Sequence, residues 1–224
     1  MPTSAGAALL EVLPHDLLLF SDPAAFVPAM PAVKWLSEAL SLCRVAVVRR
    51  AVCDHGMIPI GVRGFARHER CAGFISAGNV AKRITPESLV ESHAWQSCAR
   101  FHAIPAMRHL EHIAESWRSL FLAWGPTGSI GFELATGVAS ARAESDLDLR
   151  ILCPEPMPRD VARELFSTAQ SGDVRVDIQL ETPRGAVALV EYVSGSPKLL
   201  LKTNQGPLLV TTPWTETSCE EAGA

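Results

Sequence analysis

Ser145-Asp146-Leu147-Asp148-Leu149-Arg150-Ile151-Leu152 is the segment from which the second half of this chain can best be interpreted. Polar and apolar residues alternate along it, which predicts a strand with one buried face. Its carboxylates, Asp146 and Asp148, then project from one face with Cα atoms about 7 Å apart. Two carboxylates on one face repel each other unless a cation or hydrogen bonds compensate. The segment therefore predicts a divalent metal site, with Mg²⁺ expected and Mn²⁺ as the alternative. The solvated face of a surface strand is the other interpretation of this pair taken alone.

A third carboxylate and a glycine-rich segment accompany this strand. Asp177 lies in a second alternating segment, residues 175–180, where a neighbouring strand would complete a three-carboxylate cluster. Upstream, residues 124–137 contain Gly128-Ser129 but match neither the Rossmann GxGxxG nor the Walker pattern. A Gly-Ser turn before a helix, a Ser-Asp-x-Asp strand and a lone Asp in a later strand together resemble the polymerase-β-like nucleotidyltransferase superfamily.

This resemblance implies a role for each residue of the constellation. Gly128 and Ser129 would contact phosphate, and Asp146 and Asp148 would bind the metal. Asp177 would be a third ligand or would help to deprotonate the attacking hydroxyl. The gap of 17 residues from Ser129 to Asp146 is longer than the commonest version of the motif, which predicts an extended helix or loop after the turn.

The composition indicates a folded protein rather than a disordered, fibrous or membrane protein. With 224 residues and 48% hydrophobic content, the chain can bury one large core or two small ones. No apolar run reaches about 18 residues, and the first basic residue is Lys34, so we expect neither a membrane span nor a signal peptide, and a cytoplasmic location. A net charge of -4 and 6% aromatic residues argue against nucleic-acid binding. The six cysteines are widely spaced and are expected to be reduced packing residues.

A local excess of positive charge lies between residues 44 and 83, a stretch that contains eight basic residues and two acidic ones. Such a density suits a compact polyanion such as a nucleotide phosphate chain, and a solvated basic face is the alternative. The candidate phosphate-binding residues are Arg49, Arg50, Arg63, Arg67, Arg70 and, near the end of the chain, Lys202.

The order of the expected elements predicts an α+β protein with two domains. Residues 1–84 would form a small basic β-rich domain and residues 85–214 a nucleotidyltransferase domain with a mixed sheet, followed by a flexible tail over 215–224. The expected strands cover residues 45–50, 58–64, 147–152, 174–181, 187–192 and 199–202. The expected helices cover residues 33–42, 105–124 and 158–169, the second because its apolar residues recur every three or four positions.

Across most of its length the chain resembles the malonate decarboxylase holo-acyl-carrier-protein synthase family. The blocks that carry the resemblance are residues 14–18, 47–50, 59–64 with Arg67 and Arg70, 124–137, 145–149, 201–203, 206–207 and 213–214. It implies transfer of the phosphoribosyl-dephospho-CoA group of 2'-(5''-triphosphoribosyl)-3'-dephospho-CoA to a serine of the acyl-carrier subunit of malonate decarboxylase, with release of pyrophosphate. The alternatives are a nucleotidyltransferase that uses ATP on a small molecule or a protein, and a catalytically silent nucleotide-binding assembly factor.

Overall fold

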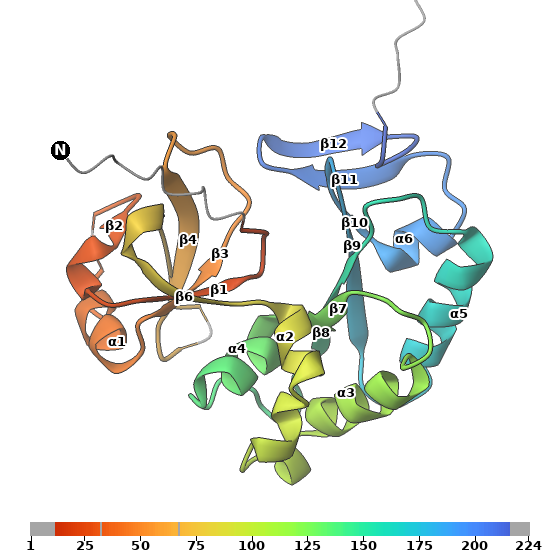
Figure 1. The fold of residues 1–224 in the computed structure, drawn as a ribbon, viewed down its shortest axis with the longest axis horizontal. Helices are drawn as coiled ribbons and strands as arrows, with labels where there is room; N and C mark the ends of the chain where they lie inside the picture. The colour runs from red at the N-terminus through yellow and green to blue at the C-terminus, as the bar shows by residue number, and fades with distance from the viewer. Residues whose placement is uncertain (1–11, 32, 67, 216–224) are drawn as a thin grey trace, which may run out of the picture. The chain divides into compact units, whose positions relative to one another are not determined.

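The structure is a computed structural model that describes residues 12–31, 33–66 and 68–215. Its backbone divides into two units, Met1–Thr85 and Pro86–Ala224 (Figure 1). Each unit has a hydrophobic core of its own. The first is built on an antiparallel sheet and the second on a mixed sheet with helices, which confirms the predicted α+β class. Arg67 and residues 216–224, which make up most of the predicted tail, lie outside the described residues.

Within the described residues, six strands form the sheet of the first unit in the order β2-β5-β4-β3-β1-β6, with every neighbouring pair antiparallel. They are β1 (Leu17–Phe20), β2 (Val27–Pro28), β3 (Val45–Val48), β4 (Met57–Arg63), β5 (Arg70–Ser76) and β6 (Val80–Ile84). Helix α1 (Leu36–Leu42) packs on the sheet. Along β4, Ile58, Ile60 and Val62 point into the core, and the residues between them point away from it.

Two expected elements of this unit are shorter than predicted. The strand expected over residues 45–50 ends at Val48. Beyond it, the Arg49 N–H donates to the Pro59 carbonyl at 2.8 Å, but Pro59 has no N–H to return, so the regular ladder stops. The helix expected from residue 33 begins at Leu36, and Trp35 at its N-cap makes no side-chain capping hydrogen bond.

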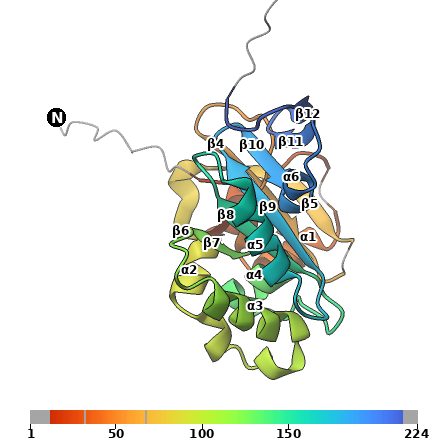
Figure 2. The same ribbon diagram turned by 90° about the vertical axis from the view of Figure 1, so that its right-hand side faces the viewer.

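The second unit has a mixed sheet in the order β12-β11-β10-β9-β8-β7. Its strands are β7 (Trp124–Pro126), β8 (Leu147–Leu152), β9 (Val176–Thr182), β10 (Gly185–Ala188), β11 (Leu199–Thr203) and β12 (Gly206–Val210). Its α-helices are α2 (Pro86–Glu91), α3 (Pro105–Ser116), α4 (Gly128–Thr136), α5 (Arg159–Ala169) and α6 (Leu189–Val193). Strands β8 and β9 run parallel, and α5 makes the crossover between them (Figure 2). The other neighbouring strands of this sheet are antiparallel.

Helices α3 and α5 cover one face of this sheet and bury its apolar residues. Leu110 and Ile113 of α3 and Leu165 of α5 are fully buried in the same core as Leu147 and Ile151 of β8. The apolar residues of β8 therefore point to this side, and its polar residues point to the opposite side. In the described part of the chain, no helix is both long and apolar enough to cross a membrane.

The apolar periodicity after residue 105 predicted too long a helix. Helix α3 ends at Ser116, and the chain turns back so that Trp124 opens β7. Trp117 and Trp124 nevertheless meet edge to face, with ring centroids 4.8 Å apart. Both are buried as the periodicity required, but a reversal of the chain brings them together rather than a continued helix.

The strand expected over residues 187–192 is correct only over its first two residues. Strand β10 ends at Ala188, and α6 follows directly over Leu189–Val193. Leu189 and Tyr192, three positions apart, are both buried, which is a helical spacing that the short apolar run did not reveal. Strands β7 and β12 were not expected at all.

Candidate active site

Asp148 and Asp177 are neighbours across the two parallel strands. Each is the second residue of its strand, and they are direct partners in the register of β8 with β9. Paired residues of adjacent strands lie about 4.8 Å apart and point to the same face, so the two carboxylates stand side by side. Asp146 lies one residue before β8, two positions before Asp148. All three residues are half-buried rather than enclosed.

Gly128 begins α4 directly above the Asp148 carboxylate. Its φ is +60°, and a Cβ at this position would lie 2.9 Å from Asp148 Cγ and closer still to Oδ2. The Thr127 N–H donates to the Asp148 carbonyl at 2.8 Å, which fastens the N-terminus of α4 to β8. The first N–H groups of a helix have no partner within it, so Gly128 and Ser129 present anion-binding donors beside the carboxylates. The structure thus brings the Gly-Ser turn and the aspartates together.

The carboxylates fit a divalent cation of the kind that binds few protein ligands. Mg²⁺ is commonly held by one or two carboxylates and completes its shell with water and substrate phosphates. No group of three or more His, Cys, Asp or Glu in the described ranges is arranged to hold a metal ion. Asp177 instead pairs with Arg175 at 3.2 Å, an exposed and therefore weak ion pair. The three-carboxylate ligand set stays a prediction, while the oxygen donors of Asp148 and its neighbours suit the ion.

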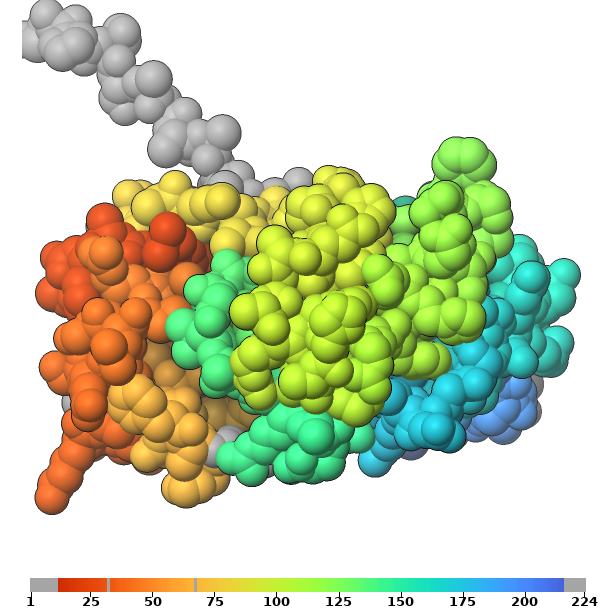
Figure 3. Space-filling model, turned by 90° about the horizontal axis from the view of Figure 1, so that it is seen from below, coloured from red at the N-terminus to blue at the C-terminus, as the bar shows by residue number. Residues whose placement is uncertain are grey.

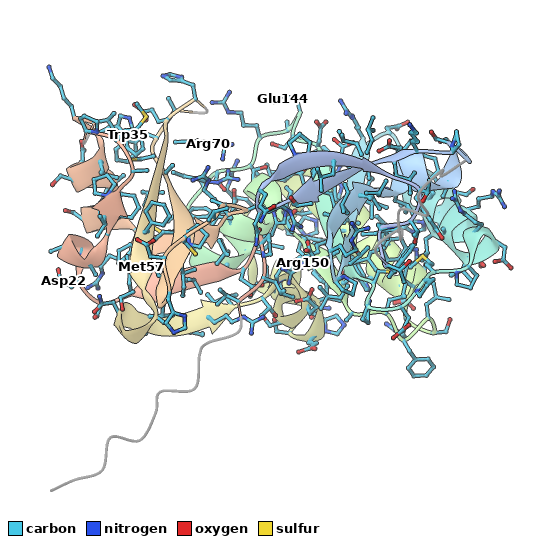
Figure 4. The ribbon with its side chains drawn as sticks, turned by 90° about the horizontal axis from the view of Figure 1, so that it is seen from above. Asp22, Trp35, Met57, Arg70, Glu144 and Arg150 are labelled. Carbon is cyan, nitrogen blue, oxygen red and sulfur yellow. The ribbon has the colours of Figure 1, made fainter. Side chains whose placement is uncertain are left out.

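Arg150 is a site neighbour that sequence reasoning missed. It lies two residues after Asp148 on the same polar face of β8, and its side chain is fully buried (Figure 4). Its guanidinium binds Glu87 of α2 with Nη2 at 2.8 and 3.0 Å from the two carboxylate oxygens. The alternation Asp-x-Asp-x-Arg was the signal, because a charged residue that continues the polar face of a half-buried strand requires a partner.

Three basic residues of the first unit lie on the sheet face opposite its core. Arg63 and Arg70 are direct partners across β4 and β5, on the side that alternates with the buried residues. A Cβ at Gly61 would lie 2.9 Å from Arg49 Cδ, so the stem of Arg49 lies over Gly61 on this same face. Like charges on directly opposite residues repel, and a bound anion would offset that repulsion. Three predicted phosphate-binding residues therefore share one surface.

Of the other predicted basic residues, the structure describes Arg50 and Lys202, one in each unit. Arg50 follows Arg49 beyond the end of β3 and is half-buried. Lys202 is exposed in β11 of the second unit. It pairs with Ala186 of β10, which in turn pairs with Glu181 of β9. That position is about 13 Å along the sheet from Asp177 and about 10 Å across it, too far for Lys202 to act with the aspartates on one phosphate.

The five cysteines in the described residues are free thiols. Cys153 is 4% exposed, and its S–H donates to the Glu155 carbonyl at 3.3 Å. Burial raises the pKa of Cys153 to about 11. Because the thiolate is the nucleophile, such a group is inert near neutral pH.

We expect exposed Cys53 to react with iodoacetamide at pH 8 at least about 100-fold faster than Cys153, because burial raises the pKa of Cys153 to about 11 and also shields its thiol from the reagent. Quantifying the alkylated peptides by mass spectrometry over time checks this. In denaturant the two rates should converge, and equal rates in the folded protein would contradict the burial of Cys153.

Comparison with known proteins identifies the family. The sequence model described as "Phosphoribosyl-dephospho-CoA transferase MdcG N-terminal domain" matches residues 13–86, and its "C-terminal domain" counterpart matches residues 89–213. The chain belongs to the phosphoribosyl-dephospho-CoA transferase family. It is therefore an enzyme of the transferase class, and both matched regions coincide closely with the two structural units.

Curated relatives in this transferase family match nearly the whole chain. Proteins named phosphoribosyl-dephospho-CoA transferase are 42% identical in Pseudomonas aeruginosa, over 90% of this chain and 93% of the relative, and 39% identical in Pseudomonas putida GB-1, over 90% and 94%. The relative of that name in Azotobacter vinelandii is 38% identical over 91% of this chain and 94% of its own length. No solved structure matches this chain.

Proposed function

We propose that this chain transfers the phosphoribosyl-dephospho-CoA group of 2'-(5''-triphosphoribosyl)-3'-dephospho-CoA to a serine hydroxyl of the acyl-carrier subunit of malonate decarboxylase. A bond forms between the serine oxygen and the phosphorus next to the ribose, the bond from that phosphorus to the leaving oxygen breaks, and pyrophosphate departs. The serine proton passes to a base. The observation that carries the proposal is the adjacency of Asp148, Asp177 and Gly128 in a chain of this transferase family.

In the second unit, some residues would bind the phosphates and another would accept the serine proton. The N–H groups at the start of α4, at Gly128 and Ser129, would hold the phosphates, because a helix N-terminus favours anions. Asp177 is half exposed beside Asp148 and would accept the serine proton, or would act as a ligand. Most of the catalysis would come from positioning and charge stabilisation.

A divalent cation would complete this arrangement. Asp146 and Asp148 would hold Mg²⁺ or Mn²⁺, with Asp177 as a further ligand, and the ion would offset negative charge on the departing pyrophosphate. Without a cation, carboxylates beside a triphosphate would repel the substrate.

Intact-mass measurement of the acceptor protein tests the proposal. Purified enzyme, precursor, Mg²⁺ and the carrier subunit should give one added phosphoribosyl-dephospho-CoA per carrier, and a carrier with its serine changed to alanine should stay unmodified. A parallel reaction with ATP in place of the precursor separates the ATP-dependent alternative. Addition of AMP to the carrier, or no mass change with the authentic precursor, would refute the assignment.

The free thiols fit the reducing cytoplasm, where we place the reaction.

The basic face of the first unit should contribute to binding the precursor. Arg49→Ala and Arg70→Ala are each expected to weaken precursor affinity by about 5 to 150-fold, because each would remove a charge-assisted contact of about 1–3 kcal/mol. Calorimetric titration with the precursor measures this. The matched control is Arg118→Ala, which removes another exposed arginine from an ion pair just after α3. Unchanged affinity in both variants would make this surface a solvated basic face.

A further inference from the structure

A buried carboxylate in α4 binds the connection that leads to the aspartates. Glu133 is 2% exposed and lies in the helix that begins with Gly128. Its Oε2 accepts the backbone N–H groups of Ser140 and Ala141, each at 2.8 Å. A buried carboxylate is costly unless its oxygens are bonded, so this side chain fixes the position of the chain at residues 140–141.

Arg100 closes the same cluster from a third segment. Its Nη1 lies 3.0 Å from both carboxylate oxygens of Glu133, and its Nη2 donates to the Ala141 carbonyl at 3.0 Å. Arg100 comes just before the short 3-10 turn Phe101–Ala103, and Figure 3 shows this part of the chain beside residues 128–140. The guanidinium thus joins α4, the connection and the segment before α3 in one cluster.

The cluster is linked to both parts of the candidate active site. The Ser140 hydroxyl donates to the Ser129 carbonyl at 2.8 Å, which ties the connection to the turn above Asp148. Beyond Ala141, Arg142 N donates to Ser145 Oγ at 2.9 Å and Ser145 N to the Arg142 carbonyl at 3.1 Å, so a closed turn reaches Asp146. The long gap between Ser129 and Asp146 is therefore fixed at Glu133 instead of being a free loop.

We propose that Glu133 and Arg100 are positioning residues, which hold the α4 to β8 connection and thereby set the places of Ser129 and Asp146. Neither is argued to touch substrate. The expected effect on transfer rests on the proposed function. The expected effect on the backbone of residues 138–146 does not depend on that function. A displacement of about 1 Å in such a site can cost about 100-fold in rate, so loosening this cluster would lower kcat.

Glu133→Gln tests the proposal, because it keeps the shape but removes the charge, and in either orientation its NH2 group faces a donor, which is Arg100 Nη1 or the N–H groups of Ser140 and Ala141. The expected result is a kcat lower by about 10 to 100-fold, with KM for the carrier changed less than about threefold, at unchanged folded fraction. Hydrogen exchange of the amides of residues 138–146 should be at least about tenfold faster. Glu115→Gln is the control, since Glu115 forms an exposed ion pair with Arg118 at 2.5 Å.

Arg100→Lys provides a second variant if Glu133→Gln fails to fold. Lysine keeps the charge opposite Glu133 but loses the donor to the Ala141 carbonyl, so we expect a smaller fall in kcat and faster exchange of the same segment. Unchanged exchange of residues 138–146, or unchanged kcat with faster exchange, overturns the proposal. If wild-type enzyme does not modify the carrier, the proposed function fails, while the exchange result still tests the positioning role.

Discussion

Asp148→Asn is expected to lower kcat for carrier modification by on the order of 10³-fold or more. The substitution keeps the size of the side chain and removes the negative charge that would hold the cation beside the phosphates. Asp146→Ala should act in the same direction. In Asp148→Asn the free energy of unfolding should change by less than about 1 kcal/mol, because Asp148 is half-buried and its negative charge lies beside that of Asp177.

Single-turnover assays with carrier mass as the readout measure the chemical step directly. Asp173→Asn is the matched control, since Asp173 is an exposed aspartate shortly before β9. We expect that control to keep the wild-type rate. An Asp148→Asn enzyme with near wild-type kcat and the same Mg²⁺ dependence would refute the catalytic assignment of the aspartates.

Gly128→Ala is the second change with a large expected effect. The added Cβ would overlap the Asp148 carboxylate, and the backbone at φ +60° already disfavours a side chain. Relief of the overlap requires the turn above Asp148 to move, so we expect kcat to fall by about 100-fold or more. Stability should also fall, by more than the about 1–2 kcal/mol of the backbone term alone.

Gly137→Ala separates the effect of backbone strain at a positive φ from the effect of moving the turn above Asp148. Gly137 ends the same helix with φ +72°, but a Cβ there meets no atom within 4 Å. This variant should lose about 1–2 kcal/mol of stability and keep its kcat, because only the backbone cost applies. Chemical denaturation and transfer assays on both variants decide the point. Equal kcat values for the two would show that the contact between Gly128 and Asp148 does not matter for transfer.

Local patterns predicted the strands of the site well. The alternation over residues 147–152 matches β8 at both ends, since a half-buried strand must alternate. The same logic placed Asp177 in a strand, and the register then brought it beside Asp148. The turn at Gly128 was recognised from its residue types, and the structure places it over Asp148.

Contacts between distant segments could not be predicted in this way. Glu133 looks like one polar residue in an apolar helix, and its partners lie 33 residues before it and seven and eight residues after it. The pairing of Arg150 with Glu87 spans 63 residues. Periodicity reports which positions are buried, but it does not report whether the chain continues or reverses, which is why α3 was predicted too long.

The parallel pairing of β8 with β9 has a consequence for sequence comparison. Asp148 and Asp177 are held by the strand register, and the crossover through α5 only has to return the chain to the sheet. Lengthening a surface loop of that crossover costs little, about 0.6 kcal/mol for each doubling of loop length. Insertions between residues 153 and 175 would therefore leave the two carboxylates in place. A search for related enzymes should treat the spacing between the two aspartates as variable, and require instead that each stands second in its strand.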